Sequence, residues 1–133
     1  MVSTKTSQVR IAVAEDVPGN RMIIVRLLER LGHKVICAVS NGADLLCECS
    51  AQQVDLVVTD LDMPVMDGLA AAQELSERGI PVVLISGHPD AEEIVLEHEP
   101  VVARVLKPVS LRSLKSAIEL ALADVQNISP HAR

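Results

Sequence analysis

The fold is decided by the stretch Asp55-Leu-Val-Val-Thr-Asp60-Leu-Asp-Met-Pro-Val-Met-Asp-Gly68. Its apolar run Leu56–Val58 is rich in β-branched residues and bounded by turn residues, which predicts a short strand buried on both faces. The strand stops at the acid Asp60, and an Ala/Leu-rich helical segment follows from Leu69 to about Arg78. Ligands of open parallel sheets bind at the carboxyl ends of the strands, so Asp60 is a candidate site residue.

The same alternation of strand and helix extends along the chain in both directions. The other expected strands are Ile11–Ala14, Val35–Val39, Val82–Ile85 and about Val102–Leu106. The other expected helices run to about Leu31 after a break at Pro18–Asn20, from about Ala43 to Ala51, from Pro89 to about His98, and from Ser110 onward. Right-handed crossovers then place helices on both faces of a five-stranded parallel sheet. We expect one α/β domain over residues 9–126, with flexible tails at 1–8 and 127–133.

Two of these helices show an apolar stripe at helical spacing. In the first, Ile23, Leu27 and Leu31 are the expected core positions, and Gly32 is the expected stop. The last helix has Ser110 as its expected N-cap. Its apolar face comprises Leu111, Leu114, Ile118, Leu122 and Val125.

Composition excludes several classes of function. The 133 residues are 49% hydrophobic and 23% charged, which is typical of one globular domain. No apolar run approaches the roughly 18 residues of a membrane span, and residues 1–10 lack the apolar core of a signal peptide, so we expect a soluble cytoplasmic protein. A net charge of -6 and the absence of aromatic residues disfavour direct nucleic-acid binding. The spacing of Cys37, Cys47 and Cys49 indicates neither a disulfide framework nor a zinc site.

Four of the five expected strands end in polar or charged residues. Glu15 and Asp16 follow the first strand, Asp60 the third, Ser86 the fourth and Lys107 the fifth. In a parallel sheet these side chains converge on one edge. Each of these residues also has a purely structural interpretation when taken singly. The acids could be helix-entry or Asx-turn residues, Ser86 could be a turn hydroxyl, and Lys107 could be a solvated lysine.

Taken together, these groups favour phosphoryl transfer. Three adjacent carboxylates need a cation or a raised pKa, and Mg²⁺ binds through carboxylates and phosphate oxygens. Lys107 could neutralise a bound anionic group, the Ser86 hydroxyl could donate a hydrogen bond to it, and Asp60 could act as the nucleophile. Asp67-Gly68 is first of all turn and helix-entry chemistry, and Met63 and Met66 are expected to pack.

The sequence from about Arg10 to Val125 resembles the receiver domain of two-component response regulators. The features that carry the resemblance are Glu15-Asp16, the Asp60–Gly68 stretch, Ser86-Gly87 and Lys107-Pro108. It implies a flavodoxin-like, doubly wound sheet of order 2-1-3-4-5 and phosphorylation of Asp60. It also implies Mg²⁺ (or Mn²⁺) bound directly by Asp16, Asp60 and the main-chain carbonyl of Asp62, and mostly through water by Glu15. Ser86 is then the switch hydroxyl and Lys107 its charge partner, and the Lys107-Pro108 bond is cis.

The sequence departs from the family pattern where an aromatic usually reports activation. Arg104 occupies that position, and Val109 follows Lys107-Pro108, where Phe is common. We therefore hypothesise that Arg104 acts electrostatically, by pairing with acids of the expected helix between Asp90 and Glu99 or with a partner. Asp62 and His88 occupy positions that in this family influence the rate at which the phosphoryl group is lost.

The resemblance implies a histidine kinase or histidine phosphotransfer protein as one partner and an unidentified downstream protein as another. The domain could be a stand-alone protein or part of a larger one, and a monomer or a phosphorylation-dependent dimer. A degenerate receiver that serves only as an interaction module is one alternative. A haloacid-dehalogenase-type phosphatase is another, since Asp60-Leu-Asp62 matches its DxD motif, but there the acidic metal pair follows that motif. An FMN module would find Glu15-Asp16 repulsive to its phosphate.

Overall fold

The computed structural model describes residues 8–61, 63, 66, 68–87 and 103–128. One parallel sheet has the order β2-β1-β3-β4-β5, as predicted. Its strands are β1 (Arg10–Ala14), β2 (Lys34–Val39), β3 (Leu56–Asp60), β4 (Val82–Ser86) and β5 (Ala103–Leu106). The described helices are α1 (Pro18–Arg30), α2 (Gly42–Ala51), α3 (Gly68–Glu77) and α5 (Leu111–Ile128). The helix expected between Pro89 and His98 lies outside the described residues.

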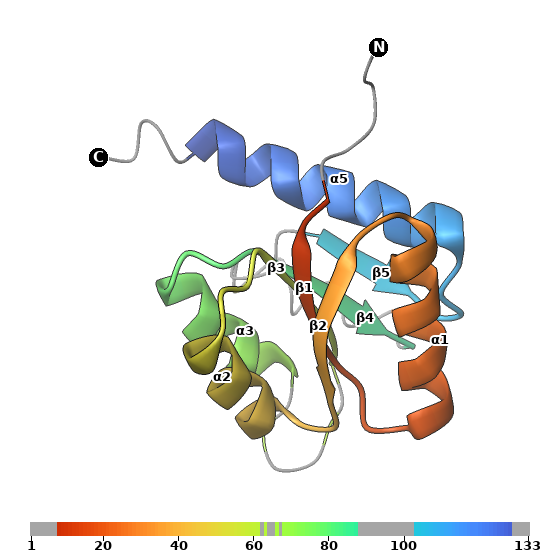
Figure 1. Cartoon of the computed structure of the whole chain (residues 1–133), viewed down its shortest axis with the longest axis horizontal. Coiled ribbons are helices and arrows are strands. Elements are labelled where there is room, and N and C mark those ends of the chain that lie inside the picture. Colours follow the sequence, from red (N-terminus) through yellow and green to blue (C-terminus); the bar gives the residue numbers. More distant parts are fainter. Residues whose placement is uncertain (1–7, 62, 64–65, 67, 88–102, 129–133) are drawn as a thin grey trace.

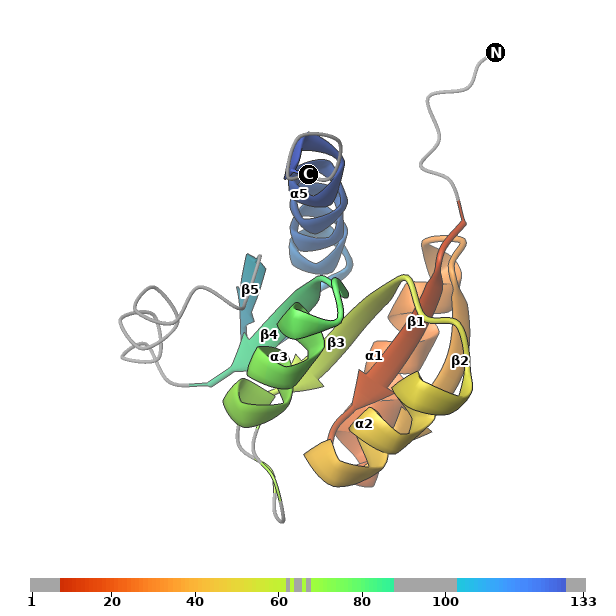
Figure 2. The same cartoon turned by 90° about the vertical axis from the view of Figure 1, so that its left-hand side faces the viewer.

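Helices cover both faces of the sheet (Figures 1 and 2). On one face, α1 and α5 pack against alternate strand residues in a core that includes Ile11, Val13, Leu56, Val58 and Ile85. On the other face, α2 and α3 pack against the intervening residues, including Ala12, Ala14 and Val57. Because successive strand residues point to opposite faces, a strand covered on both sides must be apolar throughout. This requirement explains the uninterrupted apolar runs in β1, β3 and β4.

Helix α1 differs from the prediction in its start and its buried face. It begins at Pro18, which was expected to precede it, because proline lacks an N–H and its fixed φ suits the first turn of a helix. Ile24 and Leu28 are its fully buried positions, whereas Ile23 is 51% exposed. The predicted stripe through Ile23 was therefore displaced by one residue, since several consecutive apolar residues leave the helical phase ambiguous.

Several element ends follow the expected local chemistry. Asn41 caps α2 by accepting a hydrogen bond from the Asp44 main-chain N–H at 2.8 Å, and Ser110 caps α5 in the same way through the Ser113 N–H at 3.1 Å. Gly32 lies just beyond α1 with a φ of 95°, a left-handed conformation that glycine adopts without a Cβ penalty. Helix α5 extends to Ile128, so the predicted domain boundaries stay a prediction.

The edge strand β5 alternates between buried and exposed residues, in contrast to the central strands. Ala103 and Val105 face the core, and Arg104 is exposed between them. Alternation of this kind suits an edge strand with one solvated face. The predicted pairing of Arg104 with the acids between Asp90 and Glu99 involves residues outside the described ranges. No helix in the described part of the chain has the length and apolarity needed to cross a membrane.

Candidate functional site

The register of the sheet brings the ends of its central strands to one edge. Ala14, the last residue of β1, is paired with Thr59 in β3, so Glu15 and Asp60 follow at the same level. Asp60 is paired with Ile85 in β4, and Ser86 comes next. The carboxyl ends of β1, β3 and β4 therefore supply neighbouring polar side chains, as the sequence predicted.

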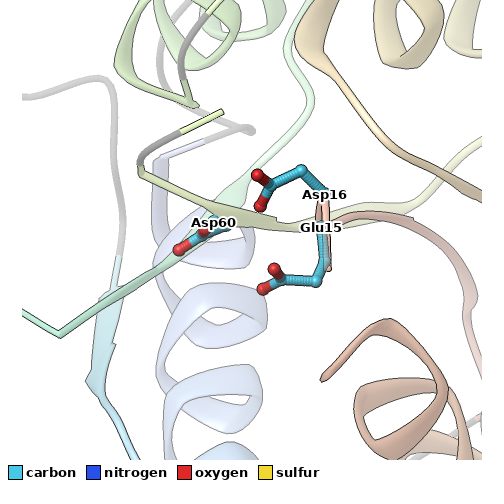
Figure 3. A group of neighbouring side chains, drawn as sticks. All are labelled: Glu15, Asp16 and Asp60. Carbon is cyan, nitrogen blue, oxygen red and sulfur yellow. The ribbon is translucent and has the colours of Figure 1, made fainter. Parts of the chain in front are cut away.

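Three carboxylates meet at this edge. Glu15, Asp16 and Asp60 each offer an oxygen, and these oxygens lie within 4.8 Å of one another. Figure 3 shows the side chains of Glu15 and Asp16 extending from the end of β1 toward Asp60 on the adjacent strand. Asp60 is only 3% exposed and Glu15 is fully buried, whereas Asp16 is more open to solvent. Such a cluster concentrates negative charge at one point of the sheet edge.

Lys107 supplies the positive charge at the cluster. Its Nζ lies 3.2 Å from Oδ1 of Asp60 and 3.8 Å from Oε1 of Glu15. The main-chain N–H of Lys107 donates to the Ser86 carbonyl at 2.8 Å, which fixes the chain as it leaves β5. The following Lys107-Pro108 peptide bond is cis, as the resemblance implied. Within the described part of the chain, Lys107 thus pairs with two of the three acids of the cluster.

Glu15 shows most directly that a cation would fit. Its Oε2 accepts a hydrogen bond from the Val17 main-chain N–H at 3.1 Å, but its buried Oε1 has no hydrogen-bond partner in the described structure. Burial raises the pKa of Glu15 despite the Val17 hydrogen bond, and the charge of Asp60 raises it further. A buried carboxylate oxygen that accepts no hydrogen bond is well suited to bind a hard divalent cation, because such cations prefer oxygen ligands.

The remaining predicted site residues are only partly described. Ser86 is 6% exposed at the end of β4, next to the strand that carries Asp60. Asp62, whose main-chain carbonyl the resemblance assigns to the metal, lies outside the described residues, as do Asp67 and His88. Their roles stay predictions.

Gly68 contributes to the site in a way that sequence reasoning missed. Its main-chain N–H donates to the Leu61 carbonyl at 2.8 Å, and a Cβ at this position would overlap the main-chain carbonyl oxygen of Asp60. Only glycine allows the start of α3 to approach the end of β3 so closely. The Asp67-Gly68 pair had suggested a turn, which gives no sign of this contact.

A cavity of about 410 Å³ opens beside the cluster. Its lining comes from the end of β1, the first turns of α1 and the segment after β5, and it includes Glu15, Asn20, Ile23 and Lys107. Ile23 is half exposed here. The acidic cluster is therefore reachable from solvent past the N-terminal half of α1.

Comparisons with known proteins agree on one family. A family model described as the response regulator receiver domain matches residues 11–119. Among solved structures, the chain is similar to a response regulator receiver domain protein from Clostridium thermocellum. That similarity has a TM-score of 0.78 and 26% identity over 90% of this chain and 98% of the other. The signal receiver domain of NarL from Mycobacterium tuberculosis gives a TM-score of 0.78 at 27% identity, over 91% and 98%.

Two similar curated proteins are longer than this chain. The sensory/regulatory protein RpfC of Xanthomonas campestris is 35% identical over 95% of this chain, which spans 18% of RpfC. The transcriptional regulatory protein PdtaR of Mycobacterium tuberculosis is 28% identical over 90% of this chain and 60% of its own length. The chain thus spans less than two thirds of either relative.

Proposed function

This chain belongs to the response regulator receiver family, and we propose that Asp60 accepts a phosphoryl group from a histidine kinase or a histidine phosphotransfer protein. Receiver domains are phosphoryl acceptors and not turnover enzymes. The observation that supports Asp60 as the acceptor is its position: it is a buried carboxylate at the end of β3, 3.2 Å from the ammonium group of Lys107 and beside Glu15 and Asp16.

The proposed transfer is a displacement at phosphorus. A carboxylate oxygen of Asp60 forms the new O–P bond while the P–N bond of the donor phosphohistidine breaks. The imidazole leaves with the electron pair of that bond and is protonated on its other nitrogen. The ammonium group of Lys107 balances negative charge on the phosphoryl oxygens, and the Ser86 hydroxyl donates to one of them once the group is in place.

Receiver domains bind Mg²⁺ through an acidic cluster, and this structure contains such a cluster. We propose that Glu15, Asp16 and Asp60 hold Mg²⁺ or Mn²⁺, together with the main-chain carbonyl of Asp62. When bound, the ion supplies positive charge for the phosphoryl oxygens. The buried Oε1 of Glu15 supports this assignment, since it accepts no hydrogen bond among the described residues and Lys107 Nζ approaches it only to 3.8 Å.

The relatives include a sensor histidine kinase and a tetrathionate response regulatory protein, which supports the proposal of a phosphorelay partner. We propose that phosphorylation changes the affinity of the domain for a downstream protein, and that the acyl phosphate is then lost slowly by self-catalysed hydrolysis. We also propose a cytoplasmic location, because histidine kinases take their phosphoryl group from ATP.

The proposal is tested by intact mass spectrometry after incubation with acetyl phosphate, with Mg²⁺ or with a chelator. Wild type should gain one phosphoryl group only with Mg²⁺, and Asp60→Asn should gain none. Asp44→Asn is a matched control, because it removes an exposed aspartate of α2 and should leave labelling intact. Absence of labelling in wild type, under conditions that label another receiver, would contradict the proposal and favour a degenerate interaction module.

A further inference from the structure

A second, larger cavity of about 1030 Å³ lies between the C-terminal end of α1 and the first turns of α5. In Figure 1 the end of α1 lies beside the start of α5, and the two helices are in contact. None of its lining residues belongs to the cavity beside the acidic cluster. It is therefore a separate feature of the surface, and what it binds is a question beyond the proposed phosphoryl transfer.

The charges around this cavity reverse those of the whole chain. The chain has a net charge of -6, yet the lining carries Arg30, Arg112 and Lys115 against a single acid, Glu119. None of the four forms an ion pair within the described part of the chain. Three cations that face one space without internal partners create a positive potential that attracts an anionic group.

His33 adds a buried hydrogen-bond donor to the same lining. It is 6% exposed, and its Nδ1 accepts the Val9 main-chain N–H at 3.3 Å. Burial lowers the pKa of His33, which favours the neutral ring. With Nδ1 as acceptor, the neutral ring carries its proton on Nε2. This Nε2–H has no hydrogen-bond partner among the described residues.

The cavity also offers apolar surface. Three apolar residues line it: Leu31 is half buried, Leu111 is 37% exposed and Ile118 is buried. An occupant that fits must combine negative charge with apolar groups. Side chains of an acidic, leucine-rich peptide segment provide both, whereas a nucleotide base would find no aromatic ring to stack on anywhere in the chain.

We propose that this cavity is the docking site for an acidic segment of a partner protein, whose carboxylates pair with Arg30, Arg112 and Lys115. Its apolar side chains pack on Leu31 and Leu111. Charge complementarity of this kind sets the rate and specificity of docking, and it weakens as salt rises. The proposal is independent of phosphorylation, because no part of it involves Asp60.

The test uses the full chain in chelator, without a phosphoryl donor, and a fluorescein-labelled peptide composed of Glu and Leu as the probe. Fluorescence anisotropy should show saturable binding that weakens as salt is added. Arg112→Gln with Lys115→Gln should weaken it about fivefold to tenfold, since each exposed ion pair contributes a modest amount. The control pair, Arg26→Gln with Lys34→Gln, removes the same charge from exposed positions outside the lining and should change it less than about twofold.

A variant that is expected to bind the probe more tightly controls for loss of binding that is caused by misfolding. Glu119→Gln removes the one acid of the lining and should tighten binding about twofold to fivefold, which a damaged protein would not do. Equal weakening by both double variants would overturn the proposal, because general charge attraction would then suffice. Equal binding of the probe with Gln in place of Glu, or its displacement by a nucleoside diphosphate, would also overturn it.

Discussion

Asp60→Asn should stabilise the protein in the absence of divalent cations, although it removes an ion pair. At an effective dielectric constant of about 20, unit charges 3.2 Å apart attract by about 5 kcal/mol. Asp60→Asn loses this attraction between Asp60 and Lys107. Each ionised carboxylate pair within 4.8 Å repels by at least about 3.5 kcal/mol, and Asp60 belongs to two such pairs. Relief of both repulsions outweighs the loss.

The size of the gain is limited by Glu15. Its raised pKa means that it takes up a proton more readily, which reduces the repulsion that Asp60 experiences. Replacing the buried charge of Asp60 by a neutral amide adds to the gain, because desolvation of the carboxylate is no longer required. We expect a net increase in unfolding free energy of about 1–2 kcal/mol, or roughly 3–8 °C in Tm.

The assay is urea unfolding in chelator, followed by far-ultraviolet circular dichroism because the chain contains no Trp, Tyr or Phe. With Mg²⁺ the order should reverse, since wild type gains about 2.7 kcal/mol at a hundred times its Kd. Asp44→Asn removes an equal charge from the first turn of α2 and should cost about 0.3–1 kcal/mol. A lower stability of Asp60→Asn in chelator would refute the reasoning.

Three further substitutions test other features. Ile24→Ala should lower the free energy of unfolding by about 2–5 kcal/mol, whereas Ile23→Ala should change it by no more than about 0.5 kcal/mol, because only Ile24 is buried. Similar urea midpoints for the two variants would contradict the assigned buried face of α1. Gly68→Ala should lower the free energy of unfolding by about 1–3 kcal/mol and reduce labelling by acetyl phosphate, because the added Cβ would collide with the Asp60 carbonyl. Gly19→Ala is the control: its Cβ would meet no atom, and it should stabilise the protein by about 0.5–1 kcal/mol. Burial holds the pKa of His33 below its ordinary value, so the unfolded chain binds the proton first and stability falls as pH drops below about 6.5. His33→Gln should flatten that decline in urea midpoints measured across the same pH range.

The sequence was sufficient for the strands because double-sided burial leaves a simple pattern. Leu56, Val57 and Val58 had to be apolar on both faces, and a carboxylate directly after them marked the end of β3. The convergence of Glu15 and Asp60 followed from parallel topology alone. The distance from Lys107 to Asp60 could not be predicted in this way, because it depends on the path of the chain from β5 across the end of β4.

Sequence reasoning was weakest where helices meet other elements. The phase of α1 could not be read from a run in which Ile23, Ile24, Leu27 and Leu28 are all apolar, since any of several stripes has helical spacing. The approach of the ends of α1 and α5, which creates the basic cavity, depends on how the two helices cross. A crossing angle results from side-chain packing in three dimensions, and no local motif encodes it.

A main-chain hydrogen bond joins the start of α2 to Met66, which follows β3. Gly42 is buried there, its N–H donates to the Met66 carbonyl at 3.1 Å, and a Cβ would lie 2.6 Å from that oxygen. Hydrogen exchange at this amide requires the bond to open, so its rate reports separation of the two segments. The exchange rate of the Gly42 amide, measured by NMR, would therefore report how often the segment that follows Asp60 separates from α2.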